Sequence, residues 1–154
     1  VWMINFSLNE DNFKRIILHP LVIIGSDGWA RAPYGPLGKD KPHPRSYGTF
    51  PRMLGRYVRE EGIMSMERAI EKMTSLTARK FGLYGRGIIK EGNFADLVVF
   101  APEQIIDRST WTDPHQYPEG IPYVIVNGIP VIYEGEHTDA FPGRILRKSQ
   151  TVVL

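Results

Sequence analysis

The sequence predicts an α/β fold, and three observations lead to this prediction. An apolar run at residues 21–24 stops abruptly at the polar sequence GSDG, as a buried strand stops at a loop. Residues 1–6 have the pattern of a short strand and a helical pattern follows them, so residues 1–27 have the size of one strand–helix–strand unit of a parallel sheet. After Gly92 the pattern changes to short β-rich runs, which predicts a separate small β module.

Asp27 is the first candidate for chemistry because it follows the apolar run directly. In parallel α/β proteins, ligands bind and catalytic groups project at the carboxyl ends of strands, most regularly in the (β/α)8 barrel. Ser26, Asp27 and Gly28 are also residue types that favour tight turns, through local hydrogen bonds and their φ preferences. The local pattern therefore leaves two interpretations open, a turn and a site.

The first predicted helix precedes this segment. Ser7 and Glu10 have the spacing of a capping box, and apolar residues then recur at helical spacing over 13–17 until the break at His19. Residues 28–52, which follow the candidate site, are rich in glycine, proline and basic residues. Irregular connections of this length are uncommon unless they are functional or flexible, so we expect an active-site loop here.

Three further helices are predicted after this loop. Thr49 is expected to cap a helix that carries Leu54, and Ser65 is expected to cap the next one. The third starts at Ser75 and ends at Gly82, because glycine readily adopts the left-handed conformation that follows a helix end. The sequence thus predicts a helical block between the loop and the β module.

The β module consists of a strand and a hairpin. Residues 95–100 form a β-rich run, and residues 123–133 contain two β-branched segments joined by Asn-Gly, the strongest short-range hairpin signal. Pro130 cannot donate a hydrogen bond to a neighbouring strand, which places the second segment at a sheet edge. Residues 141–154 are expected to form a polar, partly extended tail.

Composition narrows the class of protein. The 154 residues, 42% hydrophobic and 23% charged, fit one well-filled globular domain. A net charge of +2 with interspersed signs lacks the basic footprint of nucleic-acid binding, and no apolar run approaches a membrane span, so we expect neither a nucleic-acid nor a membrane partner. The absence of cysteine fits a reducing compartment and predicts a cytoplasmic protein.

The order of the motifs SDG, HPRSYGTFPR, GIIKEGNFADLVVF and DPHQYPEGI resembles the C-terminal part of the amidohydrolase superfamily, specifically the N-acyl-D-amino-acid deacylases (D-aminoacylases). The resemblance covers residues 3–147. In that family a metal-dependent (β/α)8 barrel is joined to a small β-sandwich. A complete barrel takes roughly 250 residues, so the resemblance implies an incomplete barrel: residues 1–90 as its last strand and helix units with the active-site loop at 28–52, and residues 91–154 as the C-terminal share of the sandwich and a tail.

The resemblance also implies a reaction, the zinc-dependent hydrolysis of the amide bond of a small-molecule N-acyl-D-amino acid. Asp27 would take a proton from the zinc-bound water and return it to the departing amine. Arg45 would hold the substrate carboxylate through two parallel charge-assisted hydrogen bonds, and Ser26, Gly28 and His43 would contact the substrate. The alternatives are a solvated loop arginine at position 45 and a locally packed histidine at position 43.

The resemblance places the zinc ligands on earlier barrel strands, and none of the four histidines has a paired ligand spacing such as HxH or HExxH, so we expect no metal ligand in this chain. The chain would then be inactive alone and would need a missing N-terminal half. Two alternatives stay open, which leaves it undecided whether the chain is an enzyme. One is a non-catalytic remnant that self-associates or binds a partner, and the other is an amidohydrolase that acts on cyclic amides.

Overall fold

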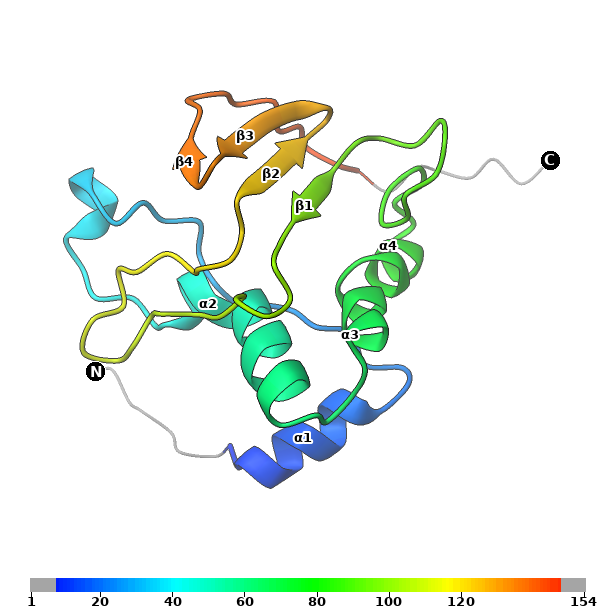
Figure 1. Cartoon of the computed structure of the whole chain (residues 1–154), viewed down its shortest axis with the longest axis vertical. Coiled ribbons are helices and arrows are strands. Elements are labelled where there is room, and N and C mark those ends of the chain that lie inside the picture. The colour runs from blue at the N-terminus through cyan, green and yellow to red at the C-terminus, as the bar shows by residue number, and fades with distance from the viewer. Residues whose placement is uncertain (1–7, 148–154) are drawn as a thin grey trace.

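The computed structural model places helices in the first part of the chain and an antiparallel sheet in the last part (Figure 1). The structure describes residues 8–147. Its elements are α1 (Glu10–Leu18), the 3-10 helix η1 (Gly35–Gly38), α2 (Arg45–Arg52), the π-helix η2 (Met53–Glu60), α3 (Met66–Met73), α4 (Ser75–Phe81), β1 (Leu97–Val99), β2 (Tyr123–Val126), β3 (Ile129–Tyr133) and β4 (Glu136–His137). Within this part of the chain, every helix is too short or too polar to cross a bilayer.

Helix α1 is capped by Asn9. Its side-chain oxygen accepts hydrogen bonds from the backbone N–H groups of Asp11 and Asn12, at 2.9 and 3.2 Å. The cap predicted at Ser7 is therefore wrong, and the strand predicted at residues 1–6 lies outside the described residues. The helix ends where the sequence predicted, because His19 takes an extended conformation before Pro20.

The apolar segment 21–24 is not a strand, which corrects the sequence prediction. Residues 22–32 have no regular secondary structure. Ile24 is buried, whereas Leu21 is 82% exposed. A strand needs a neighbour to bond its backbone N–H and C=O groups, and the four strands of the described residues all belong to one antiparallel sheet that does not include this segment. The strand–helix–strand unit is thus not formed within residues 8–147.

Helix α2 begins at Arg45, five residues earlier than predicted. Thr49 is inside this helix and donates a hydrogen bond from Oγ1 to the backbone oxygen of Arg45 at 3.0 Å, so its predicted role as the helix cap is wrong. Pro51 lies in the last turn of α2. Proline has no N–H to donate, so one regular α-helical hydrogen bond is lost, and the chain continues as the π-helix η2. The predicted apolar residue Leu54 is buried on η2.

Helices α3 and α4 confirm the sequence prediction. Ser65 Oγ accepts a hydrogen bond from the backbone N–H of Arg68 at 3.2 Å and caps α3. Ala69 on α3 is completely buried. Helix α4 ends at Gly82, whose φ of 67° is left-handed. The cap of α3 and the glycine that ends α4 act on backbone groups close to them in sequence, so both could be recognised without knowledge of the packing.

The hairpin is confirmed. Strands β2 and β3 are antiparallel and are joined by Asn127 and Gly128, both with positive φ, 49° and 81°, as a two-residue hairpin turn requires. Strand β1 pairs with β2 and covers three residues, fewer than the run at 95–100. Sheet order is β1-β2-β3-β4, so β3 is an inner strand and the edge position predicted for Pro130 is wrong. Proline is tolerated there because the β2–β3 register shifts beside it and β4 pairs only further along β3.

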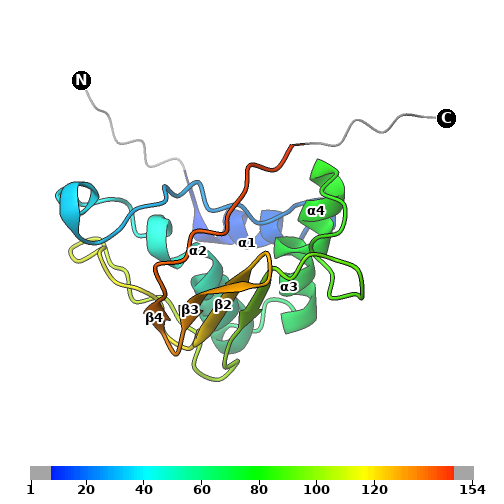
Figure 2. The same ribbon diagram turned by 90° about the horizontal axis from the view of Figure 1, so that it is seen from above.

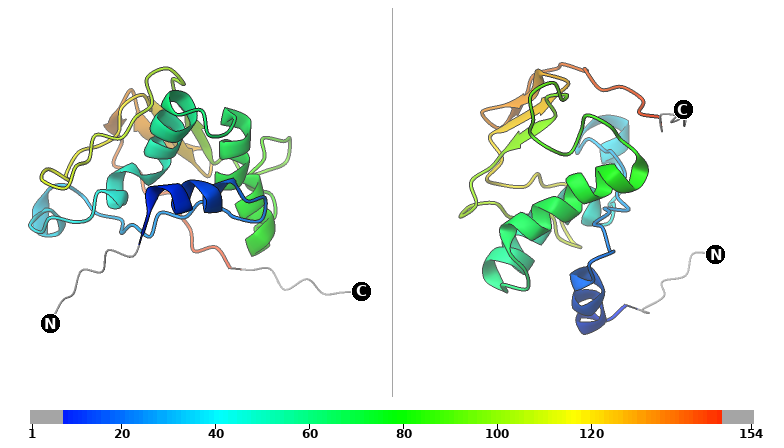
Figure 3. Two further views of the ribbon diagram at one scale, coloured as in Figure 1. Left: turned by 90° about the horizontal axis from the view of Figure 1, so that it is seen from below. Right: turned by 90° about the vertical axis from the view of Figure 1, so that its right-hand side faces the viewer.

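The core lies between α1, η2 and α3, and the sheet and α1 occupy opposite ends of the molecule (Figures 1 and 3). The buried apolar side chains of this core are Ile17, Ile24, Met53, Leu54, Tyr57, Val58, Ala69 and Ile105. Ile105 belongs to the connection between β1 and β2, which crosses η2 at Gly55, where a Cβ atom would collide with the Ile105 backbone oxygen. Gly55 therefore permits the closest approach in the core.

Tyr57 joins η2 to α1 and provides a test of this packing. Its hydroxyl donates a hydrogen bond to Glu10 Oε1 at 2.9 Å, and burial together with the Glu10 contact raises the pKa of Tyr57 to about 12. The neutral phenol is favoured in the folded protein, so this contribution to stability is complete below the usual pKa near 10 and is lost as pH rises towards 12. Ultraviolet titration should show a late phenol step that Tyr57→Phe removes. If Glu10→Gln leaves that step unmoved, the Glu10 contact is wrong.

Candidate functional site

Asp27 and Arg45, which the sequence analysis singled out, meet in an ion pair. Arg45 Nη2 lies 2.7 Å from Asp27 Oδ2, and the two side chains are 43% and 83% exposed. An ion pair this exposed adds only about 0 to 1 kcal/mol to folding stability. The significance of the pair is therefore that it brings an acid and a guanidinium, 18 residues apart in sequence, to one place.

The local conformation of residues 26–28 creates this proximity. Asp27 has a left-handed φ of 48°, which aspartate tolerates better than most residues. Ser26 Oγ accepts a hydrogen bond from the Gly28 N–H at 3.2 Å. A Cβ atom at Gly28 would lie 2.8 Å from the backbone oxygen of Arg45 and 2.9 Å from Ser46 Cα. Glycine thus lets residues 26–28 pack directly against the start of α2, and this contact presents Asp27 to Arg45.

His43 lies next to this pair. Its Nδ1 accepts a hydrogen bond from the backbone N–H of Arg45 at 3.0 Å, so the neutral ring carries its proton on Nε2. The Trp111 ring packs edge-on against it, with centroids 4.4 Å apart. Burial holds the pKa of His43 below its usual 6.5, Arg45 lowers it further, and the Asp27 carboxylate opposes both effects. The charge balance at the site is therefore measurable at His43.

This charge balance gives a test that needs no substrate. Arg45→Gln is expected to raise the pKa of His43, because a neighbouring positive charge is removed, and Asp27→Asn is expected to lower it, because a negative charge is removed. NMR titration of the His43 ring measures both shifts. Lys80→Gln on the exposed face of α4 serves as the charge-change control and should leave the His43 titration unchanged. If Arg45→Gln and Asp27→Asn shifted the pKa of His43 in the same direction, the placement of Asp27 and Arg45 beside His43 would be wrong.

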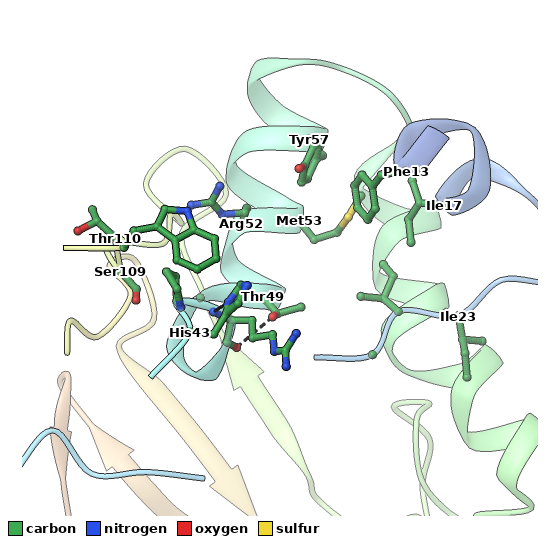
Figure 4. A pocket seen from close by; sticks show the side chains of 16 residues that line it. Phe13, Ile17, Ile23, His43, Thr49, Arg52, Met53, Tyr57, Ser109 and Thr110 are labelled. Atoms are coloured by element: carbon green, nitrogen blue, oxygen red, sulfur yellow. Dashed lines mark hydrogen bonds between the residues drawn. The ribbon is translucent and has the colours of Figure 1, made fainter. Parts of the chain in front are cut away.

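A hollow of about 550 Å³ borders the site, between α1, residues 23–25, the α2–η2 helix and residues 109–111 (Figure 4). Polar side chains gather at one end of it and apolar ones at the other. The polar end includes His43, Thr49, Arg52, Ser109 and Thr110, with the Trp111 ring against His43, and the apolar end includes Phe13, Ile17 and Ile23. An amphipathic hollow of this size suits a small molecule with an apolar body and an anionic end.

A second hollow of about 300 Å³ lies on the other side of Arg45. Ser26, Gly28 and Trp29 contribute to its wall, together with Tyr47 of α2. Arg45 is thus common to both hollows, whereas Asp27 lines neither and reaches them through its ion pair with Arg45. The structure therefore brings all five predicted site residues together around the start of α2.

The donors of this site do not form a metal centre on their own. Within residues 8–147, no three His, Asp or Glu side chains cluster closely enough to hold a metal ion. Asp27 is paired with a guanidinium, and His43 Nδ1 is occupied by a backbone N–H. Zinc sites in proteins use three or four such ligands, so no zinc ligand set can be assigned to this part of the chain.

Comparison with known proteins decides the family. A model described as the amidohydrolase family matches residues 7–132. The chain belongs to the amidohydrolase family. The curated D-aminoacylase of Alcaligenes xylosoxydans xylosoxydans is 44% identical over 146 residues, which are 95% of this chain and 29% of that protein. The chain therefore spans less than a third of the length of this relative.

Two solved structures show the same relationship for this amidohydrolase chain. A D-aminoacylase, studied for the role of its binuclear metal centre, superimposes with a TM-score of 0.82 at 42% identity, covering 91% of this chain and 28% of that one. The N-acyl-D-glutamate deacylase of Bordetella bronchiseptica, in complex with zinc and a phosphonate that mimics the tetrahedral intermediate, gives 0.80 at 45% identity, covering 92% and 28%. The predicted resemblance to zinc-dependent N-acyl-D-amino-acid deacylases is confirmed.

Sequence reasoning missed a second ion pair of this amidohydrolase at the polar end of the larger hollow. Arg52 donates hydrogen bonds from Nε and Nη2 to Asp107 Oδ2, at 2.9 and 2.7 Å, and the Asp107 side chain is only 6% exposed. Gly48 makes room for it, since a Cβ atom there would lie 2.7 Å from Asp107 Cβ. The long irregular connection that carries Asp107 and Trp111 was the available signal, because such connections are often functional.

His115 was also left without a role, and the structure gives it one. Its Nε2 lies 2.7 Å from the backbone oxygen of Asp40, which can only accept a hydrogen bond, so Nε2 is the donor. Its Nδ1 then accepts from the Tyr47 hydroxyl at 3.0 Å. Lys41 Nζ donates to the Thr112 oxygen nearby, and the loop around η1 runs beside the 107–117 connection (Figure 2). These contacts hold the segment around Asp40, Lys41 and Tyr47 against the motif DPHQYPEGI and the residue before it.

Proposed function

We propose that this chain contributes the C-terminal part of a zinc-dependent deacylase that hydrolyses the amide bond of N-acyl-D-amino acids. Residues 1–90 would supply the last strand and helix units of a (β/α)8 barrel, and residues 91–154 the C-terminal share of a β-sandwich and a tail. The predicted active-site loop at 28–52 is a loop only up to residue 44, because α2 occupies Arg45–Arg52. The segment 21–24 would become a strand when barrel strands outside residues 8–147 pair with it. The chain alone would be inactive.

The observation that supports this proposal most strongly is the Asp27–Arg45 pair. A guanidinium binds a carboxylate through two parallel hydrogen bonds, and the Arg45 guanidinium already binds one, that of Asp27. An N-acyl amino acid brings its own carboxylate to the site. In the proposal this carboxylate replaces Asp27 at Arg45, with Ser26, Gly28 and His43 as further contacts, and the exchange releases the Asp27 side chain.

The released Asp27 would act in proton transfer. Its carboxylate accepts a proton from the attacking water, and the protonated acid gives it to the departing amine as the amide C–N bond breaks, so the proton balance closes. Zinc, when bound, makes such a water ionise near neutral pH. Because residues 8–147 offer no ligand set for it, the proposal assigns zinc to polypeptide outside these residues.

A chimera tests the function directly. In the chimera this chain takes the place of the corresponding segment of the Alcaligenes D-aminoacylase, with which it is 44% identical. The chimera with zinc is expected to hydrolyse N-acyl-D-amino acids, and the isolated chain is expected to have no activity. N-acyl-L-amino acids and hydantoin-type cyclic amides are the comparison substrates. A folded, zinc-loaded chimera that opens cyclic amides and leaves the linear D-substrates intact would contradict the proposal and favour a cyclic-amide hydrolase.

Arg45→Lys in the chimera tests the carboxylate contact. Lysine keeps the charge and loses the planar pair of donors, so KM is expected to rise about ten- to a hundredfold, as the loss of a charged hydrogen bond of about 1.5–3 kcal/mol predicts. Steady-state kinetics measure this change. The matched control is an N-acyl-D-amino-acid amide, which has no carboxylate. Its KM should be the same with the unaltered chimera and with Arg45→Lys. An equal rise in KM for acid and amide would rule out the assigned contact.

The second candidate is a non-catalytic remnant that self-associates, and exposed apolar side chains favour it. Phe13, Ile16 and Leu21 on or after α1 are 37%, 60% and 82% exposed. Neighbouring exposed apolar residues promote association. Sedimentation of the isolated chain distinguishes the cases, since a monomer at all concentrations contradicts self-association. If the isolated chain is an oligomer and the chimera has no deacylase activity, the non-catalytic remnant is supported instead.

A further inference from the structure

Lys72, on α3, is a charged side chain with no exposed surface. A buried ammonium is costly unless hydrogen bonds replace the lost water. Within the described residues it has no carboxylate within ion-pair distance, and its Nζ instead donates to two backbone oxygens, those of His19 at 2.6 Å and Val22 at 2.7 Å. A buried ammonium that binds two backbone oxygens of another segment indicates that Lys72 holds that segment in place.

The two oxygens lie at the two ends of one turn. Val22 N–H donates to the His19 oxygen at 3.1 Å and closes the turn that follows α1. Arg68, one helical turn before Lys72 on α3, donates to the Pro20 oxygen at 3.3 Å. Carbonyl oxygens at the C-terminal end of a helix attract cations. Two cations of α3 thus hold three carbonyl oxygens of the 19–22 turn.

The segment that follows this turn carries the candidate site. Residues 23–32 make no backbone–backbone hydrogen bond to any other described residue. The buried side chain of Ile24 anchors the start of this segment, Gly28 packs against the start of α2, and Asp27 lies between the two. The segment therefore leaves the core directly from the turn whose oxygens Lys72 binds.

We propose that Lys72 is a positioning residue, whose buried ammonium fixes the 19–22 turn against α3 and thereby sets where the following segment presents Asp27 to Arg45 and His43. What Asp27 does there rests on the proposed function. The placement itself is a property of the chain and is measured without activity.

The test separates positioning from simple stabilisation. Asp27→Asn should shift the pKa of His43 only while the carboxylate lies near that ring. NMR titration measures this shift in the unaltered chain and in the Lys72→Met background. The shift is expected to be lost with Lys72→Met, while Lys80→Met on the exposed face of α4 should leave it intact. If Lys72 only stabilised the fold, Lys72→Met would lower the denaturation midpoint but leave the His43 pKa shift of the folded protein unchanged. That result would overturn the proposal.

Chemical rescue supplies the second variant. The chain has no cysteine, so Lys72→Cys introduces a unique thiol. Alkylation in denaturant followed by refolding gives either an aminoethyl group, which restores an ammonium at the length of lysine, or a neutral hydroxyethyl group of the same length, which preserves the packing. The aminoethyl protein is expected to recover the His43 shift and the hydroxyethyl protein to lack it.

The remaining outcomes are also decisive. Equal His43 pKa shifts in the two alkylated proteins would overturn the proposal. It would also be overturned if the aminoethyl protein folded and the hydroxyethyl protein did not, because the ammonium would then act through stability. If the His43 shift depends on Lys72 while the zinc-loaded chimera is inactive, the proposed function fails and the positioning role stands. If the chimera is active and the shift is independent of Lys72, the positioning role fails alone.

Discussion

Asp27→Asn is expected to reduce the kcat of the deacylase chimera by about 10²- to 10⁴-fold, the usual contribution of a general base or acid. Asparagine keeps the size and the turn preference of aspartate but cannot accept a proton. The same substitution releases Arg45 from its ion pair, so the substrate carboxylate meets less competition and KM should fall. A lower kcat combined with a lower KM is the expected signature in steady-state kinetics.

The chain offers a matched control in Asp139. It is also an exposed aspartate with a left-handed φ, 59°, and its side chain is 98% exposed near the end of the sheet. Asp139→Asn makes the same chemical change in the same backbone conformation away from the site. It should leave both kcat and KM unchanged. Retention of the full kcat by Asp27→Asn would show that another group transfers the proton.

The elements that the sequence predicted correctly are those with local signals. Ser65 caps α3, Gly82 ends α4, and the Asn127-Gly128 pair turns the hairpin, because each effect involves backbone within a few residues. Thr49 was misread for a physical reason. A threonine at a helix start accepts from the backbone, but inside a helix it donates to a carbonyl four residues back, and the sequence alone does not distinguish these positions.

The segment 21–24 shows where sequence reasoning fails. Its apolar run predicts burial, and Ile24 is buried, but a strand also requires a neighbour, which no local pattern contains. The turn preference of residues 26–28 was recognised from residue type and Arg45 through the family resemblance. The Arg52–Asp107 pair joins residues 55 apart in sequence, so only the fold reveals it.

Gly55→Ala is expected to be the most destabilising conservative change in the core. In an ordinary helix this substitution adds about 1 kcal/mol of stability. Here the added Cβ would collide with the backbone oxygen of Ile105 and lie 2.7 Å from Ile106 Cδ1. A backbone oxygen cannot turn aside as a side chain can, and Arg59 Nη1 also binds it, at 2.6 Å. The connection that carries Ile105 would have to move away from η2.

The expected cost is about 3 kcal/mol, at the upper end of what overpacking usually costs. That is a large part of the roughly 5–15 kcal/mol that stabilises a typical domain. Urea denaturation measures the change, with Gly25→Ala as control because a Cβ there meets nothing within 4 Å. The connection also carries Asp107 and Trp111 to the site, so Gly55→Ala should disturb the edge-on contact of Trp111 with His43. A denaturation midpoint equal to or above that of the unaltered chain would show that η2 and the connection are not in contact at Gly55.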